Sequence, residues 1–102
     1  MLYRQFSNEI NLEKKPICFF KGHKSSVQAV EFLSINSLLS GDHVGYLCEW
    51  DLEKNAKCND WHIFDKKAIW SICHTSNKSN FDAIICSAYN HIGFLDKRKS
   101  NN

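Results

Sequence analysis

The feature that most constrains this sequence is a repeat of short apolar runs at an interval of a little over forty residues. Val27 opens a run that returns 42 positions later at Ile69, and Asp51, which closes the first round, has its counterpart 45 positions later at Asp96. The runs are strand-sized and end at Asn, Asp, Ser or Gly, which favour turns. No stretch keeps a helical apolar period of 3.6 residues for three turns. The pattern therefore predicts an all-β chain of two consecutive antiparallel sheets.

The same pattern divides the chain into four parts. We expect an N-terminal extension at 1–15, a first repeat at 16–58, a second repeat at 59–98 and a polar tail at 99–102. The strands expected within the repeats lie at 17–20, 27–32, 37–40, 46–50, 61–64, 68–73, 83–87 and 92–95. Residues 41–45 read as a turn, because they contain two glycines and an aspartate.

The first repeat carries a series of short motifs in a fixed order. These are Gly22-His23, Leu39-Ser40-Gly41-Asp42 and Trp50-Asp51-Leu52. In order and spacing they resemble the WD40 repeat family, whose members are β-propellers. The second repeat is degenerate, with Phe64-Asp65 at the Gly-His position and Leu95 at the Trp position. Within the family, the first repeat resembles the opening blade of ASTRA-associated protein 1 and its G-protein-β-like relatives, scaffolds linked to chromatin and to kinase maturation.

The resemblance implies a hydrogen-bond relay inside the first blade. In such blades a His, a Ser or Thr, a turn Asp and the Trp form the relay, and His23, Ser40 and Trp50 match three of these positions. The turn departs from the pattern, because Val44 stands where the Asp before the glycine is expected. A complete relay therefore requires Asp42 to reach in. A buried indole N–H left without a partner costs about 1–3 kcal/mol.

The resemblance also implies that the chain is an incomplete β-propeller. Propellers hold about four to eight blades, and closure protects the edges of their sheets. We therefore expect a truncated product, a fragment of a longer protein, or a subunit that associates with itself through open blade edges. The isolated chain should then be poorly soluble or oligomeric.

For function, the resemblance implies a non-enzymatic scaffold that binds other proteins. It also implies that the scaffold is a subunit of a complex linked to chromatin or to kinase maturation. Aromatic side chains are enriched in protein interfaces, and the candidates for partner contact are Trp61, Tyr46 and Tyr89. Trp70 lies out of phase with its apolar neighbours, and we expect it to pack against an adjacent sheet.

The sequence frames no catalytic, cofactor or metal site. Cys73 and His74 are adjacent, so a strand would point them to opposite faces. There is no GxSxG, HExxH or phosphate-binding glycine loop. The chain has five Cys and five His, among them Cys18, His23 and Cys48. A structural zinc site needs two pairs of closely spaced ligands, and the spacing of these residues does not provide them.

Charge and cysteine usage bear on partners and compartment. A formal charge of +2 is too small to imply a nucleic-acid or membrane field. The alternative function is a small basic β-domain that binds nucleic acid through Lys14, Lys15, Lys66 and Lys67. An odd number of cysteines and the lack of an apolar N-terminal run favour reduced thiols in the cytoplasm or nucleus.

Overall fold

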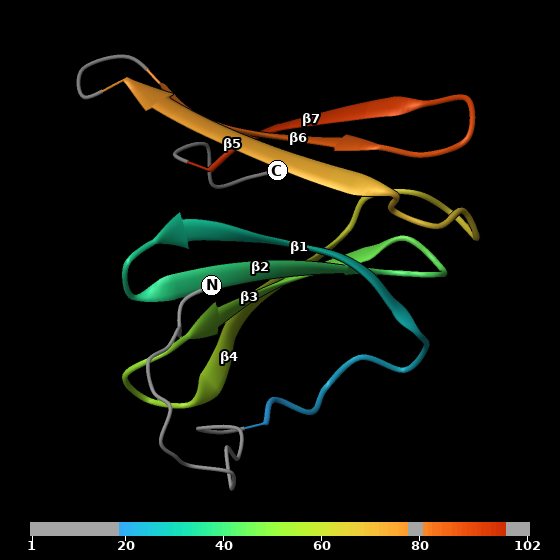
Figure 1. Cartoon of the computed structure of the whole chain (residues 1–102). Coiled ribbons are helices and arrows are strands. Elements are labelled where there is room, and N and C mark those ends of the chain that lie inside the picture. Colours follow the sequence, from blue (N-terminus) through green and yellow to red (C-terminus); the bar gives the residue numbers. More distant parts are fainter. Residues whose placement is uncertain (1–18, 78–80, 98–102) are drawn as a thin grey trace, which may run out of the picture.

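The computed structural model describes residues 19–77 and 81–97, and every regular element in this part of the chain is a strand (Figure 1). The first sheet has the order β1-β2-β3-β4 and the second has the order β5-β6-β7, with every pairing antiparallel. The strands are β1 (Val27–Ser34), β2 (Ser37–Asp42), β3 (Tyr46–Asp51), β4 (Ala56–His62), β5 (Ser71–Asn77), β6 (Phe81–Ser87) and β7 (Ile92–Asp96). The prediction of an all-β chain with two antiparallel sheets is confirmed.

The strand bounds differ from the expected ones in the stretch between the two sheets. β4 covers 56–62 instead of 61–64, and it pairs with β3 from Tyr46↔His62 to Asp51↔Ala56. The repeat boundary expected at 58/59 therefore falls inside β4. The reason is that β4 is an edge strand whose side chains are almost all exposed, so the polar stretch Ala56–Asp60 carries no apolar alternation.

The second sheet also begins later than expected, with β5 at 71–77 instead of 68–73. Ile69 and Trp70 lie in the connection, where their N–H groups donate to the carbonyls of Asp42 and Ser87. The expected turn at 41–45 is shorter, since β2 continues to Asp42. The extension at 1–15 and the tail at 99–102 lie outside the described residues, as does the first half of the strand expected at 17–20, while residues 19 and 20 belong to no strand.

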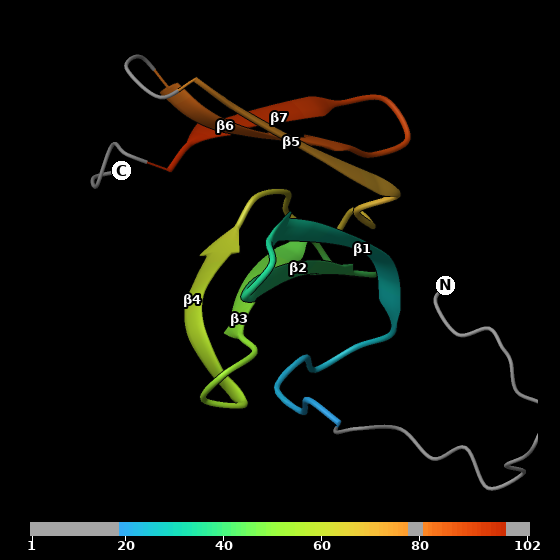
Figure 2. The same cartoon turned by 60° about the vertical axis from the view of Figure 1, so that its left-hand side comes forward.

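The apolar core lies between the two sheets. Leu39 and Leu47 of the first sheet and Ile84 of the second are fully buried there, together with Ile69 from the connection. Figures 1 and 2 show the sheets as two layers, with β5 over β1 and β2 while β4 curves away from the second sheet. Ile69 fits because Gly41 has no side chain: a Cβ there would lie 2.6 Å from the Ile69 Cγ2. The sheets thus pack closest at their first strands.

The turn between β2 and β3 depends on Gly45. Its φ of 97° lies in the region that only glycine enters at low cost, and a Cβ would lie 1.9 Å from the carbonyl oxygen of Phe64. The carbonyl of Gly45 accepts the N–H groups of Ile63 and Phe64. This glycine therefore allows the connection after β4 to pack directly against the β2–β3 turn.

Candidate functional site

Four side chains of the first sheet and the segment before it form one hydrogen-bonded chain. The indole N–H of Trp50 donates to the Ser40 hydroxyl over 2.7 Å, and Ser40 Oγ lies 2.5 Å from His23 Nε2. The other ring nitrogen, His23 Nδ1, lies 2.9 Å from Asp42 Oδ2. With the proton on Nδ1, every group is satisfied: Trp50 donates to Ser40, Ser40 to His23, and His23 to Asp42.

Asp42 occupies the place that the turn residue Val44 leaves open. Its carboxylate also accepts the backbone N–H of Tyr46 at 2.9 Å and that of Val44 at 3.0 Å. Burial alone would raise the pKa of Asp42, but the bonds from Tyr46, His23 and Val44 outweigh it and hold the pKa below its ordinary value. A carboxylate two residues before the expected position, at the end of β2, thus organises the β2–β3 turn.

Ser40, His23 and Asp42 lie in the order of a hydrolase triad, yet the hydroxyl is already engaged. Ser40 Oγ accepts the Trp50 indole N–H, and Ser40 is only 5% exposed. Phe20 and His23 cover the Trp50 ring, with ring centroids 5.2 and 5.9 Å away. These contacts hold the 19–24 segment against the outer face of the first sheet, the face turned away from the second sheet.

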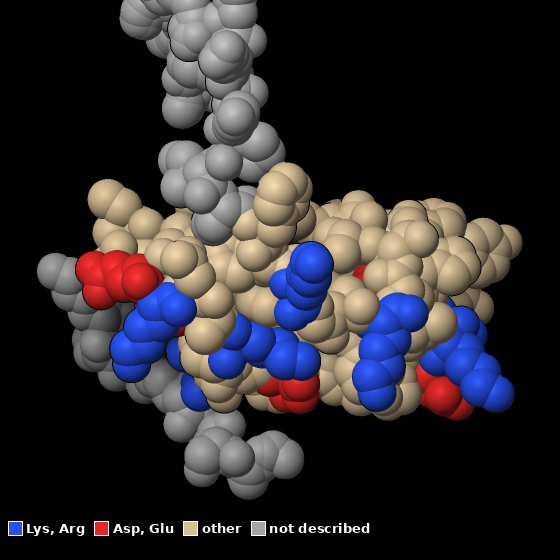
Figure 3. Space-filling model, turned by 90° about the horizontal axis from the view of Figure 1, so that it is seen from below, with Lys and Arg blue, Asp and Glu red and all other residues tan. Residues whose placement is uncertain are grey.

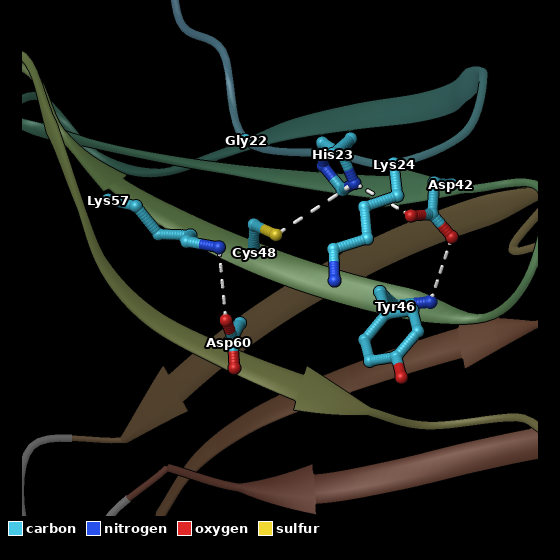
Figure 4. A pocket seen from close by; sticks show the side chains of 8 residues that line it. All are labelled: Gly22, His23, Lys24, Asp42, Tyr46, Cys48, Lys57 and Asp60. Atoms are coloured by element: carbon cyan, nitrogen blue, oxygen red, sulfur yellow. Dashed lines mark hydrogen bonds and ion pairs between the residues drawn. The ribbon is translucent and has the colours of Figure 1, made fainter.

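A pocket of about 160 Å³ opens beside this chain, on the outer face of the first sheet. Its lining residues are Gly22, His23, Lys24, Asp42, Tyr46, Cys48, Lys57 and Asp60. In Figure 4 the His23 ring lies between the Cys48 thiol and the Asp42 carboxylate, and the Lys57 amine meets Asp60 at 3.1 Å. Lys57 and Asp60, two of the charged residues that line the pocket, are therefore paired with each other.

The pocket has little nucleophilic or metal-binding chemistry to offer. Burial is the main cause that raises the pKa of the Cys48 thiol, so the thiol is kept protonated and unreactive. Within 19–77 and 81–97, no group of three or more His, Cys, Asp or Glu side chains is arranged to hold a metal ion. Cys18, one of the thiols considered from the sequence, lies outside these ranges.

A second candidate site lies where three connections meet at one end of the two sheets. The β2–β3 turn and the 63–70 connection are joined by the bonds to Gly45 and Asp42, and the connection reaches the second sheet through Trp70 N–H and Ser87 O. The β6–β7 turn closes through Ala88 N–H and His91 O. We call this end the loop end; Figure 1 shows its turns on the same side of the molecule.

Exposed aromatic and imidazole rings gather in pairs at the loop end. Trp70 and Tyr89, 57% and 79% exposed, meet edge to face with centroids 6.1 Å apart. Tyr46 stacks on His62 with centroids 4.2 Å apart and an interplanar angle of 8°. Rigid aromatic rings held on fixed backbone are typical of protein-binding surfaces. The prediction that Trp70 packs against a sheet is wrong. The residue lies in the connection just before β5 and is 57% exposed.

The three predicted contact residues do not form one surface. Trp61 pairs with Leu47 and packs against the core between the sheets, whereas Tyr46 pairs with His62. Neighbouring strand residues point to opposite faces, so Trp61 and Tyr46 lie on opposite sides of the first sheet. Tyr89 belongs to the second sheet's turn. The out-of-phase position of Trp70 was the one sequence signal that could have identified its exposure.

The basic residues considered from the sequence as a nucleic-acid site are two pairs of lysines. Lys66 is exposed and Lys67 half-buried in the connection between the sheets, while Lys14 and Lys15 lie outside the described residues. Figure 3 shows basic side chains beside acidic ones along one side of the molecule. Charge alone therefore does not distinguish a nucleic-acid site.

Comparison with known proteins gives no family: no family model matches the chain, and no curated protein is significantly similar to it. In the part of the chain that the structure describes, no helix has the length and apolar character needed to cross a membrane.

Proposed function

We propose that this chain is a non-enzymatic, protein-binding scaffold module made of two WD40-type propeller blades, the second degenerate. Three features support the blade assignment: the four-stranded meander of the first sheet, the closest packing of the two sheets at their first strands, and the Trp50–Ser40–His23–Asp42 chain at the motif positions. As two blades, it is an incomplete β-propeller. A reduced intracellular compartment, cytoplasm or nucleus, fits its free thiols at Cys48, Cys58, Cys73 and Cys86.

The observation that carries the binding role is the pair of ring contacts at the loop end. Trp70 and Tyr89 expose large apolar area, and their backbones are fixed by the bonds from Trp70 N–H to Ser87 O and from Ala88 N–H to His91 O. Such rings lose little conformational entropy on binding, because their positions are already set. The partner we infer is a protein surface that can accept two neighbouring aromatic rings.

A non-enzymatic role agrees with the geometry of the His23 chain. Its hydroxyl, imidazole and carboxylate bond to one another and to Trp50, and Ser40 and Asp42 are 5% and 1% exposed. Buried polar networks of this kind stabilise one arrangement of a fold when every member has a partner.

The test is affinity capture with matched surface variants. Trp70→Ala/Tyr89→Ala removes the edge-to-face pair, and Ile35→Ala removes an apolar side chain at the β1–β2 turn that is even more exposed than these two. We expect specific partners to be retained by the wild type and by Ile35→Ala and lost from the double variant. An identical set of partners for all three proteins would contradict the loop end as the binding surface.

A further inference from the structure

The first three strands of the first sheet are equivalent, in order and in register, to the three strands of the second sheet. In the first sheet Val30 pairs with Ser40, which pairs with Cys48; in the second Ile72 pairs with Cys86, which pairs with Gly93. The residue after each third strand makes the same backbone bond, Leu52 N–H to Asn36 O and Lys97 N–H to Asp82 O. The equivalence therefore extends from the first strands to the closing turns.

This equivalence relates the faces of the sheets as well. Directly paired residues share a face, so Val30 and Phe32 lie on the outer face of the first sheet, and their equivalents Ile72 and His74 lie on the inner face of the second. In the same way, the inner-face residue Leu47 of the first sheet is equivalent to Ile92 on the outer face of the second. The outer face of each sheet is therefore equivalent to the inner face of the other sheet. The contact inside the chain joins the two inner faces.

Burial at the first strands differs sharply between equivalent positions. Ile69 and Ile72 are 0% and 8% exposed, because the first sheet covers them. Their equivalents 42 positions earlier, Val27 and Val30, are 50% and 61% exposed, and Phe32 beside them is 64% exposed. The outer face of β1 thus presents an apolar row, and the equivalents of its first two members, Ile69 and Ile72, are buried in the second repeat.

The outer face of the second sheet shows the converse difference. Leu47 and Glu49, on the inner face of the first sheet, are 0% and 5% exposed. Their equivalents Ile92 and Phe94 are 78% and 68% exposed. Cys73 of β5 is also exposed on this face. The two outer faces are therefore equivalent to the two faces that pack together inside the chain, and the residues named here on both outer faces are exposed.

We propose that a second copy of this chain covers these faces, with the β1 row of one copy (Val27, Val30, Phe32) seated on the outer face of β5–β7 of the next (Cys73, Ile92, Phe94). This contact repeats the internal one at equivalent positions. It goes beyond the proposed function and depends on different residues, since Trp70 and Tyr89 belong to neither row.

Two differences between equivalent positions favour a second copy of the chain as the molecule that covers these faces. Inside the chain, the ion pair Lys97–Glu49 crosses between the sheets at 3.5 Å; between copies, the equivalent residues are Leu52 and Phe94, an apolar pair. Inside the chain, Ile69 packs on Gly41; between copies, the smaller Val27 would meet Ser87. At the first position a charged pair inside the chain corresponds to an apolar pair between copies, and at the second a smaller apolar side chain, Val27, meets a larger partner, Ser87. Each pair is therefore matched in charge or in size.

The two rows lie on opposite sides of the molecule, so the contact is head-to-tail. Such heterologous contacts add copies until a ring closes or a filament grows, and they do not stop at a two-fold dimer. A variant that loses one row keeps the other. Two variants with different rows removed should therefore form a dimer with each other and nothing larger.

Sedimentation velocity on the full chain tests this arrangement. The variants are Phe32→Asp, which puts a charge in the β1 row, and Phe94→Asp, which puts one in the β5–β7 row; Ile35→Asp is the control, 87% exposed in the β1–β2 turn and in neither row. At about 100 µM, which saturates contacts with a Kd of ~1 µM, we expect species larger than a dimer for the wild type and for Ile35→Asp. Each row variant alone should be a monomer, and their equimolar mixture should form a one-to-one dimer.

Several results would overturn the proposal. A wild-type monomer at this concentration would show that these faces do not bind a second copy, and a row variant that still forms a dimer alone would show a self-complementary contact instead. A mixture of the two row variants that forms no one-to-one dimer would also contradict the proposed contact. Val30→Asp and Ile92→Asp form a second pair for the same experiment if either Phe variant fails to unfold cooperatively. None of these results bears on partner capture at the loop end.

Discussion

The imidazole of His23 donates to the carboxylate of Asp42 over 2.9 Å, and this bond joins the segment before β1 to the last residue of β2. Asp42 also accepts two N–H groups of the β2–β3 turn. One carboxylate thus connects the Trp50–Ser40–His23 chain to the backbone of the loop end. Its substitution should affect stability more than any exposed acid in the sheet.

We expect Asp42→Ala to lower the free energy of unfolding by about 2–3 kcal/mol, because it leaves three partly buried donors, the His23 imidazole and the N–H groups of Val44 and Tyr46, without their acceptor. Urea denaturation measures the change. Asp60→Ala is the matched control, since its side chain is 52% exposed in an ion pair with Lys57, and its effect should stay within about 0.5 kcal/mol. Equal losses for the two variants would contradict a structural role for Asp42.

The lowered pKa of Asp42 predicts a dependence of stability on acid. Its folded pKa lies below the ordinary value of 3.8, so the ionised carboxylate stabilises the fold at pH above 3.8, and this contribution is lost as the pH falls through the folded pKa. Asp42→Asn cannot ionise. The difference in unfolding free energy between wild type and Asp42→Asn should be constant above about pH 5 and narrow below 3.8. A difference that does not narrow in acid would refute the assignment.

Truncation of two adjacent residues in the 63–70 connection should lower stability by very different amounts. Ile69 is fully buried against Gly41 between the sheets, and Ile69→Ala should cost about 2–5 kcal/mol. Trp70 is 57% exposed and touches Tyr89 at its edge, so Trp70→Ala should cost less than about 1 kcal/mol. Thermal unfolding followed by circular dichroism compares them, and a greater loss for Trp70→Ala would show that the connection packs differently.

The described cysteines should separate into two reactivity classes. Cys58 and Cys73 are exposed, whereas Cys48 and Cys86 are buried, and burial raises the pKa of Cys86 to about 11. Iodoacetamide labelling read by peptide mass spectrometry should modify Cys58, which lies outside the two proposed contact rows, in the folded protein and Cys86 only after unfolding. Labelling of Cys86 in the native state at the rate of Cys58 would show that the second sheet opens.

The repeat of apolar runs was enough to predict two antiparallel sheets without helices, and the strands near 27–32, 46–50 and 92–95 lie close to their expected places. β4 was misplaced, since an exposed edge strand pairs through its backbone and needs no apolar side chains. The start of β5 was misplaced because Ile69 is apolar for a reason other than a strand: it fills the space above Gly41.

The local periodicity can be read from the sequence: which runs can form strands, where turns interrupt them, and which motif residues recur in order. Three features became visible only in the folded chain: Asp42 replaces the missing turn acid, Trp61 and Tyr46 face opposite sides of the first sheet, and Trp70 meets Tyr89. They could not be predicted because strand alternation fixes a side chain only relative to its own strand. Which face becomes core depends on the register and on the second sheet, and these join residues far apart in the chain.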